Sequence, residues 1–539
     1  MNRTQRIVVL GIFLLAALLR FTALDQYPYG VNQDEAERGY EAYSLLKTGH
    51  DQHGHPWPLT LEAFSALRDN ASAISAYAAI PFTAWLGPGL VATRLPSAVA
   101  GLLTVLFTYA LAWRWSKRRS VAALAALTLA VSPWHLALSR LGHESVWVPC
   151  LFLAGLLAFS YGRDRRWGFP VAAVFWAIGL YGYATAKLFE PLALVSLVIL
   201  FWNDIRRRRV WVSVAVAVGL LVLIPFFTHH LLTTVFGRLN EVGVATSSSG
   251  PLGGFILNIF YYLFPNLWVG GYLGTGPLDW IIILLGIPFF FLLARPTPNI
   301  SRPRWVLSLL LLAAIIVPSL TIQNPNALRA SGLIGLYCIA GAWGLVAAWD
   351  MVKSRISRNA RMLIVAIVLF ASSAIGIRAF FSPSYTWSGA FISVKVTFIG
   401  GVQELVHTLQ TKYASVSNIR FVNDWQNQPQ AFIQLLTPWN PVTLAGDEVY
   451  GYCSNLWIPH AHGSTPHCVN GFCNLMLCDS GWYATYRLGK YTFCDLPTCM
   501  VSTPGTLYVH LTRSRIFGTQ TLDTIPIKNV PGYAWIISR

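Results

Sequence analysis

Residues 7–40 read IVVLGIFLLAALLRFTALDQYPYGVNQDEAERGY, and this stretch decides the fold class. Residues 7–23 are long and apolar enough to cross a bilayer, and Arg3 and Arg6 precede them. No clear small-x-small cleavage site follows Leu24, so we predict an uncleaved anchor rather than a signal peptide. Two adjacent acids, Asp34 and Glu35, lie just past this span. Carboxylates beside a membrane are costly to desolvate, so they predict a functional site.

The composition is that of a polytopic membrane protein. The chain has 539 residues, of which 55% are hydrophobic and only 11% charged. Its net charge of +17 does not indicate nucleic-acid binding, because no basic groove motif accompanies it. Instead, nineteen of the 39 Lys and Arg residues lie in the N-terminal tail and in short segments between apolar runs, as the positive-inside rule requires of cytoplasmic loops. These segments are 117–119, 163–166, 206–209, 295–304 and 353–361.

The apolar runs predict a bundle of about eleven transmembrane helices with a cytoplasmic N-terminus. After 7–23, they fall near 96–115, 120–135, 146–161, 168–183, 188–203, 210–227, 277–294, 305–322, 330–349 and 362–380. We expect the apolar segment 71–86 to lie at, or dip into, the outer surface. Three regions follow: an anchor and long external loop (1–95), the rest of the bundle (96–380), and an extracytoplasmic C-terminal region (381–539).

The C-terminal region predicts a small α/β or α+β domain. A helical pattern over 401–413 precedes β-like runs at 419–422, 507–511 and 534–537. Cys150 and Cys338 lie in spans, whereas the other six cysteines lie in this region, where an oxidising compartment favours up to three disulfides of undetermined pairing. A zinc site is the alternative, although the spacings are not CxxC. The six cysteines are Cys453, Cys468, Cys473, Cys478, Cys494 and Cys499, and the histidines nearest them are His460, His462 and His467.

Outer loops combine acids with cations. Besides Asp34 and Glu35, the short outer turns carry six further candidates. A carboxylate there can act as a general base, while guanidinium and ammonium groups can bind a phosphate and stabilise it as it leaves. A lipid phosphate is the natural donor outside the cell, where nucleotide sugars are absent. The six candidates are Arg140, Glu144, Tyr181, Tyr183, Lys187 and Arg329.

Several of these segments resemble the protein O-mannosyltransferases. That family belongs to the GT-C glycosyltransferases, which include the lipid A aminoarabinose transferases. The resemblance covers about 1–380, and nothing in 381–539 carries it. The segments are LDQYPYGVNQDEA (24–36), GYEAYSLLKTG (39–49), RLPSA (94–98), Ser139 and Arg140 with Glu144, and Tyr181 and Tyr183 with Lys187.

The resemblance implies transfer of a hexose or pentose, with inversion, from a polyprenyl-phosphate sugar to an extracytoplasmic protein, lipid or glycan. It implies Asp34 as the general base, Glu35 as its neighbour, and Glu144 as the second external acid. No cofactor is required, and a divalent metal is the alternative that is not favoured. The family's His-Pro-Pro segment is missing near residues 68–71, which places strict protein mannosylation in doubt.

Each feature also has a simpler interpretation. Asp34 and Glu35 could cap a helix, the outer Arg and Lys residues could anchor span ends at headgroups, and the two tyrosines could belong to an interfacial belt. The segment HDQHGH (50–55) looks like a metal site, but a flexible glycine loop is favoured. As whole-protein alternatives, a transporter or flippase of lipid-linked sugars and a non-enzymatic receptor remain open.

Overall fold

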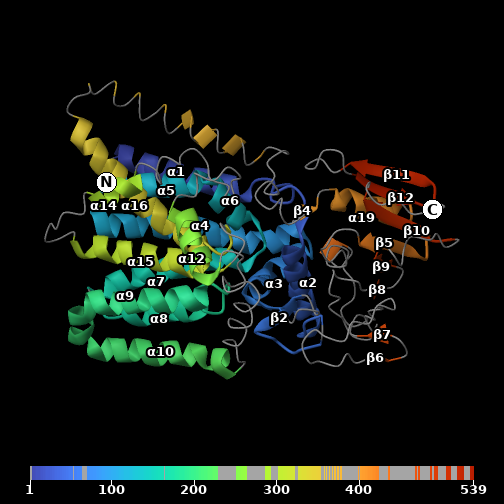
Figure 1. Ribbon diagram of the computed structural model, residues 1–539, viewed down its shortest axis with the longest axis horizontal. Coiled ribbons are helices and arrows are strands. Elements are labelled where there is room, and N and C mark those ends of the chain that lie inside the picture. Colours follow the sequence, from blue (N-terminus) through green and yellow to red (C-terminus); the bar gives the residue numbers. More distant parts are fainter. Residues whose placement is uncertain are drawn as a thin grey trace. The chain divides into compact units, whose positions relative to one another are not determined.

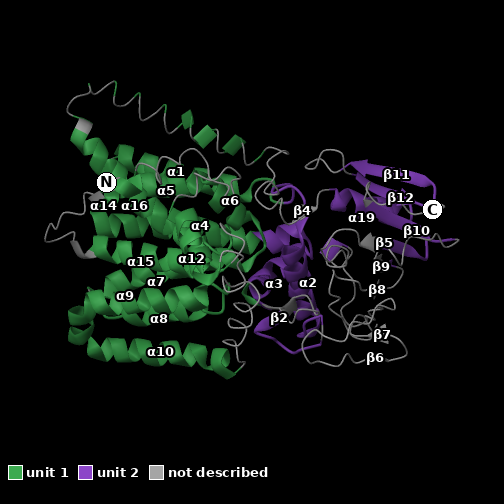
Figure 2. Cartoon of the chain, viewed as in Figure 1, with its two compact units in different colours: residues 1–24, 72–74, 95–382 green, residues 25–71, 75–94, 383–539 purple. Residues whose placement is uncertain are grey.

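The computed structural model of the chain divides into two compact units (Figures 1 and 2). Unit 1 comprises residues 1–24, 72–74 and 95–382, and unit 2 comprises 25–71, 75–94 and 383–539. Unit 2 thus combines most of the first loop with the C-terminal region. The structure describes residues 3–52, 54–63, 69–162, 164–228, 250–263, 286–292, 301–321, 326–353, 398–399, 401–423, 435–436, 468–469, 472–473, 486–488, 491–495, 505–511, 519–526 and 534–539, with scattered positions between 357 and 381.

Unit 1 is a helical bundle. Six of its described helices are long and apolar enough to cross a membrane, or seven if a bent pair counts as one span. The expected spans at 277–294 and 362–380 lie mostly outside the described residues. The helices of the bundle are α1 (Arg3–Phe21), α4 (Leu90–Ser116), α5 (Arg119–Val131), α6 (Pro133–Arg140), η1 (Glu144–Val146), α7 (Trp147–Gly162), α8 (Gly168–Gly179), α9 (Ala186–Arg207), α10 (Arg209–Thr228), α12 (Gly250–Leu263), α14 (Ile287–Leu292), α15 (Ser301–Ser319), η4 (Ser331–Leu333) and α16 (Ile334–Val352).

Two buried arginines join α1 to the bent pair α5 and α6, whose axes differ by 61°. Arg20 donates to the carbonyls of Leu129 and Ala130 at the end of α5, at 3.2 and 3.1 Å, and its guanidinium lies 2.7 Å from Nδ1 of His135. Helix C-termini carry partial negative charge and unsatisfied carbonyls, so a buried cation is stabilised there. The sequence pattern expected one span over 120–135; Pro133 instead begins a second helix after the break at Ser132.

Unit 2 contains the loop-one helix α2 (Gln33–Thr48), the apolar helix α3 (Ile74–Leu86) and the helix α19 (Val402–Thr411). Two two-stranded sheets accompany them: β1 (Val31–Asn32) with β4 (Phe398–Ile399), and β2 (Thr60–Ala63) with β3 (Asp69–Ser72). The segment expected at the outer surface, 71–86, is thus mostly α3.

A six-stranded mixed sheet forms the body of the C-terminal region. Its order is β11-β12-β10-β5-β9-β8, with β5 parallel to both β10 and β9 and the other neighbours antiparallel. The helix and three of the strands match the patterns seen in the sequence. The strands are β5 (Ile419–Asn423), β8 (Tyr486–Leu488), β9 (Tyr491–Asp495), β10 (Leu507–Leu511), β11 (Thr521–Pro526) and β12 (Ala534–Ser538), with a separate pair β6 (Cys468–Val469) and β7 (Phe472–Cys473).

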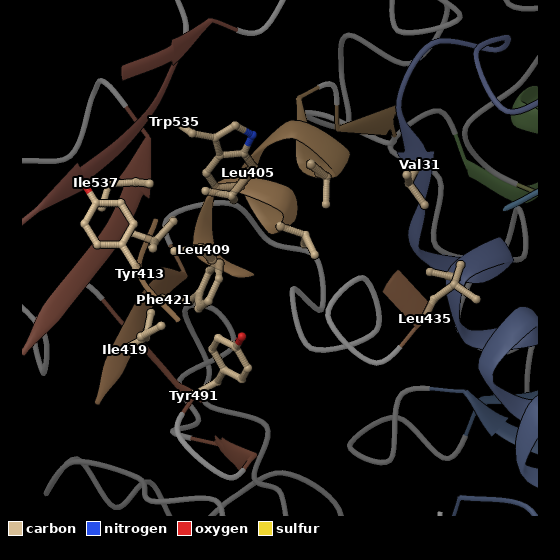
Figure 3. Packing of buried hydrophobic residues seen from close by; sticks show 14 of the residues in the cluster. Val31, Leu405, Leu409, Tyr413, Ile419, Phe421, Leu435, Tyr491, Trp535 and Ile537 are labelled. Carbon is tan, nitrogen blue, oxygen red and sulfur yellow. The ribbon is translucent and has the colours of Figure 1, made fainter. Parts of the chain in front are cut away.

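One hydrophobic core runs through unit 2 (Figure 3). It packs the apolar face of α19 against the sheet, and it also includes residues from β1 and α2. The amphipathic spacing seen in the sequence explains the first contact, because Val402, Leu405, Val406 and Leu409 recur on one face of α19 and are all buried. The contact of β1 and α2 with this core joins segments more than 350 residues apart in sequence, so no local sequence pattern predicts it.

Cysteine placement is only partly described. Cys150 and Cys338 are buried free thiols in the bundle, as expected of core residues. The backbone register of β6 and β7 sets Cys468 opposite Cys473. The side chains of the six C-terminal cysteines lie outside the described residues, so the disulfides and their pairing stay predictions.

Candidate functional site

Asp34 lies in the first turn of α2, where the local sequence specifies a helix start. Asn32 is the N-cap: its side-chain oxygen accepts from the backbone N–H of Asp34 at 2.9 Å. Glu35 completes a capping box by accepting from the N–H of Asn32 at 2.9 Å. The positive end of the helix dipole stabilises a carboxylate at this position. Asp34 is half-buried.

Glu35 is held by a fully buried arginine at the start of α4. Arg94 donates from Nε and Nη2 to the two Glu35 oxygens, at 2.9 and 2.6 Å, and neither side chain has exposed surface. The same guanidinium donates to the carbonyls of Pro28 and Gly30, at 3.3 and 2.8 Å. The pair therefore fixes both the start of α2 and the chain that leads into it. The simpler interpretation from the sequence, that Glu35 caps a helix, describes its contacts here.

Further acids line α2 beyond its first turn. Glu37 forms a buried ion pair with Arg38 at 2.9 Å. Glu41 is fully buried, and one of its oxygens accepts from the backbone N–H of Gln52 at 3.1 Å. Burial raises the pKa of the Glu41 carboxyl well above its ordinary value, and the charges of Asp51 and Glu37 raise it further, against the opposing effects of the Gln52 hydrogen bond and Arg38.

This shift predicts a pH-dependent stability. The folded state holds the Glu41 proton more tightly than the unfolded chain, so Glu41 stabilises the fold fully below about pH 4.3. That contribution falls as the pH rises through the elevated folded pKa. Glu41→Gln keeps an acceptor for Gln52 and removes the charge. We expect the variant to be more stable than the natural protein at about pH 8, with little difference at about pH 5. Thermal unfolding at both pH values measures this; equal pH dependence in the two proteins would contradict it.

Within unit 1, a second polar cluster surrounds η1. Glu144 is buried at the first position of this helix, and Lys187, in the first turn of α9, interacts with it electrostatically. His143 Nδ1 accepts from the N–H of Ser145 at 3.1 Å and lies 3.8 Å from a Glu144 oxygen. The ring of Tyr183 lies against that of His143, with centroids 5.4 Å apart. The structure thus brings Glu144, His143 and Tyr183 together, and an ammonium group such as that of Lys187 can bind an anion.

Arg329 belongs to a neighbouring part of the same unit. Its backbone N–H donates to the side chain of Asn326 at 3.1 Å, and its charge interacts with the buried Tyr262. The Tyr262 hydroxyl accepts from the N–H of Asn326 at 3.1 Å. Tyr262 therefore joins α12 to the turn that carries Asn326 and Arg329, a contact that the apolar run around α12 did not predict.

Two of the expected phosphate-binding residues, Arg140 and Tyr181, contact the backbone of neighbouring helices. Arg140 is fully buried and donates to the carbonyls of Leu19, Thr22 and Ala23 at the end of α1, at 2.7, 2.8 and 2.8 Å. The hydroxyl of Tyr181 stands between the Val222 carbonyl, at 2.7 Å, and the Phe226 N–H, at 3.0 Å. These two groups would otherwise bond to each other in α10. The Tyr181 hydroxyl thus replaces one backbone hydrogen bond of α10, next to Pro225.

Replacing Arg140 tests whether its bonds to the carbonyls at the end of α1 stabilise the fold. Arg140→Met leaves buried carbonyls at the end of α1 unsatisfied, which costs about 1–3 kcal/mol for each lost group. We expect a lower midpoint of thermal unfolding and unchanged affinity for a lipid phosphate, measured by binding of a labelled polyprenyl phosphate. Loss of binding without loss of stability would contradict this expectation and support the predicted role of Arg140 in binding the phosphate.

Metal-binding chemistry gains no support from the loop that carries the histidines. In the part of the chain that the structure describes, no three His, Cys, Asp or Glu residues are grouped so that they could hold a metal ion. His50 Nδ1 lies 2.8 Å from the Thr48 carbonyl, and His55 Nδ1 lies 3.1 Å from Asp51. These local bonds fold the loop; His53 lies outside the described residues.

The described part of the chain thus combines apolar helices long enough to cross a membrane, an acid pair just after the first of them, and a mixed sheet in the C-terminal region. Residues 73–231 match the family described as dolichyl-phosphate-mannose-protein mannosyltransferase. No curated protein matches the chain in sequence.

Solved structures share the fold. ArnT from Cupriavidus metallidurans, bound to undecaprenyl phosphate, has a TM-score of 0.56 and 14% identity, over 98% of this chain and 97% of that one. The oligosaccharyltransferase AglB from Archaeoglobus fulgidus, in complex with an inhibitory peptide and a dolichol-phosphate, has a TM-score of 0.51 and 12% identity, over 80% of this chain and 64% of that one. The resemblance to GT-C glycosyltransferases expected from the sequence is therefore confirmed, and the chain is a multi-pass membrane protein.

Proposed function

We propose that this protein is an integral-membrane glycosyltransferase that moves a sugar, with inversion, from a polyprenyl-phosphate donor to an extracytoplasmic protein, lipid or glycan. The observation that carries the proposal is Asp34, half-buried at the start of α2 and fixed there by the Glu35–Arg94 pair. The family matched by residues 73–231, and the lipid phosphates bound by ArnT and AglB, support this class of donor.

In the proposed reaction, Asp34 takes the proton from the acceptor hydroxyl or amine as that atom attacks the anomeric carbon. A bond forms between the acceptor and the sugar, and the bond between the anomeric carbon and the phosphate oxygen breaks. Polyprenyl phosphate leaves as an anion, so it needs no general acid. Lys187 and Arg329 stabilise the negative charge on that phosphate. Attack from the face opposite the leaving group inverts the anomeric centre.

The proposed topology has about eleven spans, with the N-terminus in the cytoplasm and residues 381–539 outside. The distribution of basic residues supports it, because all five basic segments then face the cytoplasm. This orientation puts Asp34 on the side where lipid-linked sugars are the available donors.

Detergent-solubilised protein incubated with radiolabelled polyprenyl-phosphate mannose and mixed acceptors tests the proposal. Label appearing on a protein, lipid or glycan supports transfer; polyprenyl-phosphate arabinose or aminoarabinose tests pentose donors in the same assay. If no donor gives a new glycosidic bond while proteoliposomes still move lipid-linked sugar across the bilayer, the protein is a transporter.

One observation favours that second candidate. Glu190 in α9 is fully buried, and neither of its carboxylate oxygens has a hydrogen-bonding partner in the described part of the chain. Buried acids inside spans often belong to translocation pathways. Under the transporter proposal, Glu190→Gln abolishes sugar movement, whereas under the transferase proposal the rate depends on Asp34.

Lys187→Met tests the proposed phosphate contact. A hydrogen bond to a charged group contributes about 1.5–3 kcal/mol, so we expect the KM for donor to rise on the order of 10- to 100-fold. Lys187→Arg keeps the charge and should restore much of the affinity. Lys412→Met, which removes an exposed lysine in the C-terminal region, serves as control. A normal donor KM in Lys187→Met would exclude Lys187 from the phosphate site.

A further inference from the structure

We infer that the C-terminal region positions the helix that carries Asp34, so that residues of the C-terminal region control the rate of the chemical step. The inference rests on the proposed function for the role of Asp34. All the contacts that carry it lie within unit 2.

The first contact is a strand pairing. β1 pairs antiparallel with β4, with Val31 opposite Ile399 and Asn32 opposite Phe398. Asn32 is also the N-cap whose side chain receives the Asp34 N–H. The strand from the C-terminal region therefore fixes the residue that starts α2, two positions before the proposed base.

The second contact is a close approach between Leu435 and α2. A Cβ atom built on Gly39 would lie 2.8 Å from Cδ1 of Leu435 and 2.2 Å from Oγ1 of Thr93. Only a glycine leaves room for both neighbours, and Leu435 has only 1% of its surface exposed. The middle of α2 is thus held between α4 and a residue of the C-terminal region.

The third contact is the common core. Val31, Ala36 and Tyr40 are buried in the same cluster as residues of α19 and the sheet, and Figure 3 shows Val31 and Leu435 next to α2. In proteins, most of the stability of a helix such as α2 comes from tertiary packing of this kind. Neither the Glu35–Arg94 pair nor the capping box replaces this apolar support over the rest of α2.

The rate that a general base supports depends on how precisely the base is positioned. A displacement of about 1 Å at the reacting groups can lower a rate on the order of 100-fold. Loosening α2 through Leu435 should therefore lower kcat. The KM for donor should change little, because the proposed phosphate ligands are Lys187 and Arg329 and not Leu435. It should also open the backbone hydrogen bonds of α2.

The test compares Leu435→Ala with Ile537→Ala. Both changes truncate fully buried residues of the same core, but Ile537 lies in β12. Hydrogen–deuterium exchange of peptides covering 33–45 is expected to accelerate about tenfold or more in Leu435→Ala and to change little in Ile537→Ala. The kcat should fall on the order of 10- to 100-fold in Leu435→Ala alone. If Leu435→Ala does not fold, Leu435→Val supplies a milder loss.

The inference is overturned if the two variants affect α2 exchange and kcat equally, or if Leu435→Ala leaves both unchanged. If the natural protein transfers no sugar, the proposed function fails, and exchange in α2 still decides whether the C-terminal region holds the helix. If the two variants differ in α2 exchange but have equal kcat, then Leu435 holds α2 without controlling the rate. That result also overturns the inference.

Discussion

Asp34→Asn is expected to lower the rate of sugar transfer on the order of 10²- to 10⁴-fold, the contribution that a positioned general base makes. The amide has nearly the shape of the carboxylate but cannot take the acceptor proton. The backbone N–H that starts α2 remains, so the helix and the KM for donor should change little. Rates in detergent or proteoliposomes, with purified donor and saturating acceptor, measure the effect.

Asp25→Asn is the matched control for this substitution. It makes the same chemical change at an exposed acid of the same loop and should keep full activity. An unchanged rate in Asp34→Asn, with the protein still folded in membranes, would remove Asp34 as the base. A loss of activity in both variants would point to the charge of the loop rather than to proton transfer.

Arg94→Met is expected to cause the largest loss of stability. The side chains of Arg94 and Glu35 have no exposed surface, and removing one partner of such a pair leaves a buried charge without compensation. This typically costs about 3–5 kcal/mol. The carbonyls of Pro28 and Gly30 lose their donor as well. The midpoint of thermal unfolding, followed by fluorescence, should fall steeply.

The double variant Arg94→Met with Glu35→Leu separates stability from function. Replacing both buried charges by apolar groups restores part of the lost stability, because no charge is left unpaired. The rate of transfer should nevertheless stay low, since the capping box that orients the start of α2 is gone. If the double variant recovered full activity, the pair would be dispensable for positioning Asp34. If Arg94→Met were as stable as the natural protein, the ion pair would not support the fold.

Local sequence patterns predicted the elements of this chain well, because span length and amphipathic spacing are local properties. The ends of α1, α9 and α10 fall close to the expected spans, and α19 and β5 occupy the expected runs. The bend between α5 and α6 was missed, since Pro133 stands inside an otherwise continuous apolar run.

The roles of individual residues were harder to predict, because they depend on partners distant in sequence. Arg94 was visible as a lone cation near the start of an apolar span, which is a signal of a buried partner. No pattern in the sequence around Arg94 identified Glu35 as that partner. Arg140 and Tyr181 have the residue types of phosphate ligands, and only the structure shows their donors directed at the backbone of α1 and α10.

The arginine bonds between α1 and the α5–α6 bend limit how the N-terminus can be exchanged. Arg20 of α1 donates to a carbonyl at the end of α5, and Arg140 of α6 donates to a carbonyl at the end of α1. A foreign leader or anchor grafted in place of α1 would lack Arg20 and would present different carbonyls to Arg140. The first helix is therefore an integral part of the bundle, and fusions intended to redirect or tag the protein should be joined before Arg3.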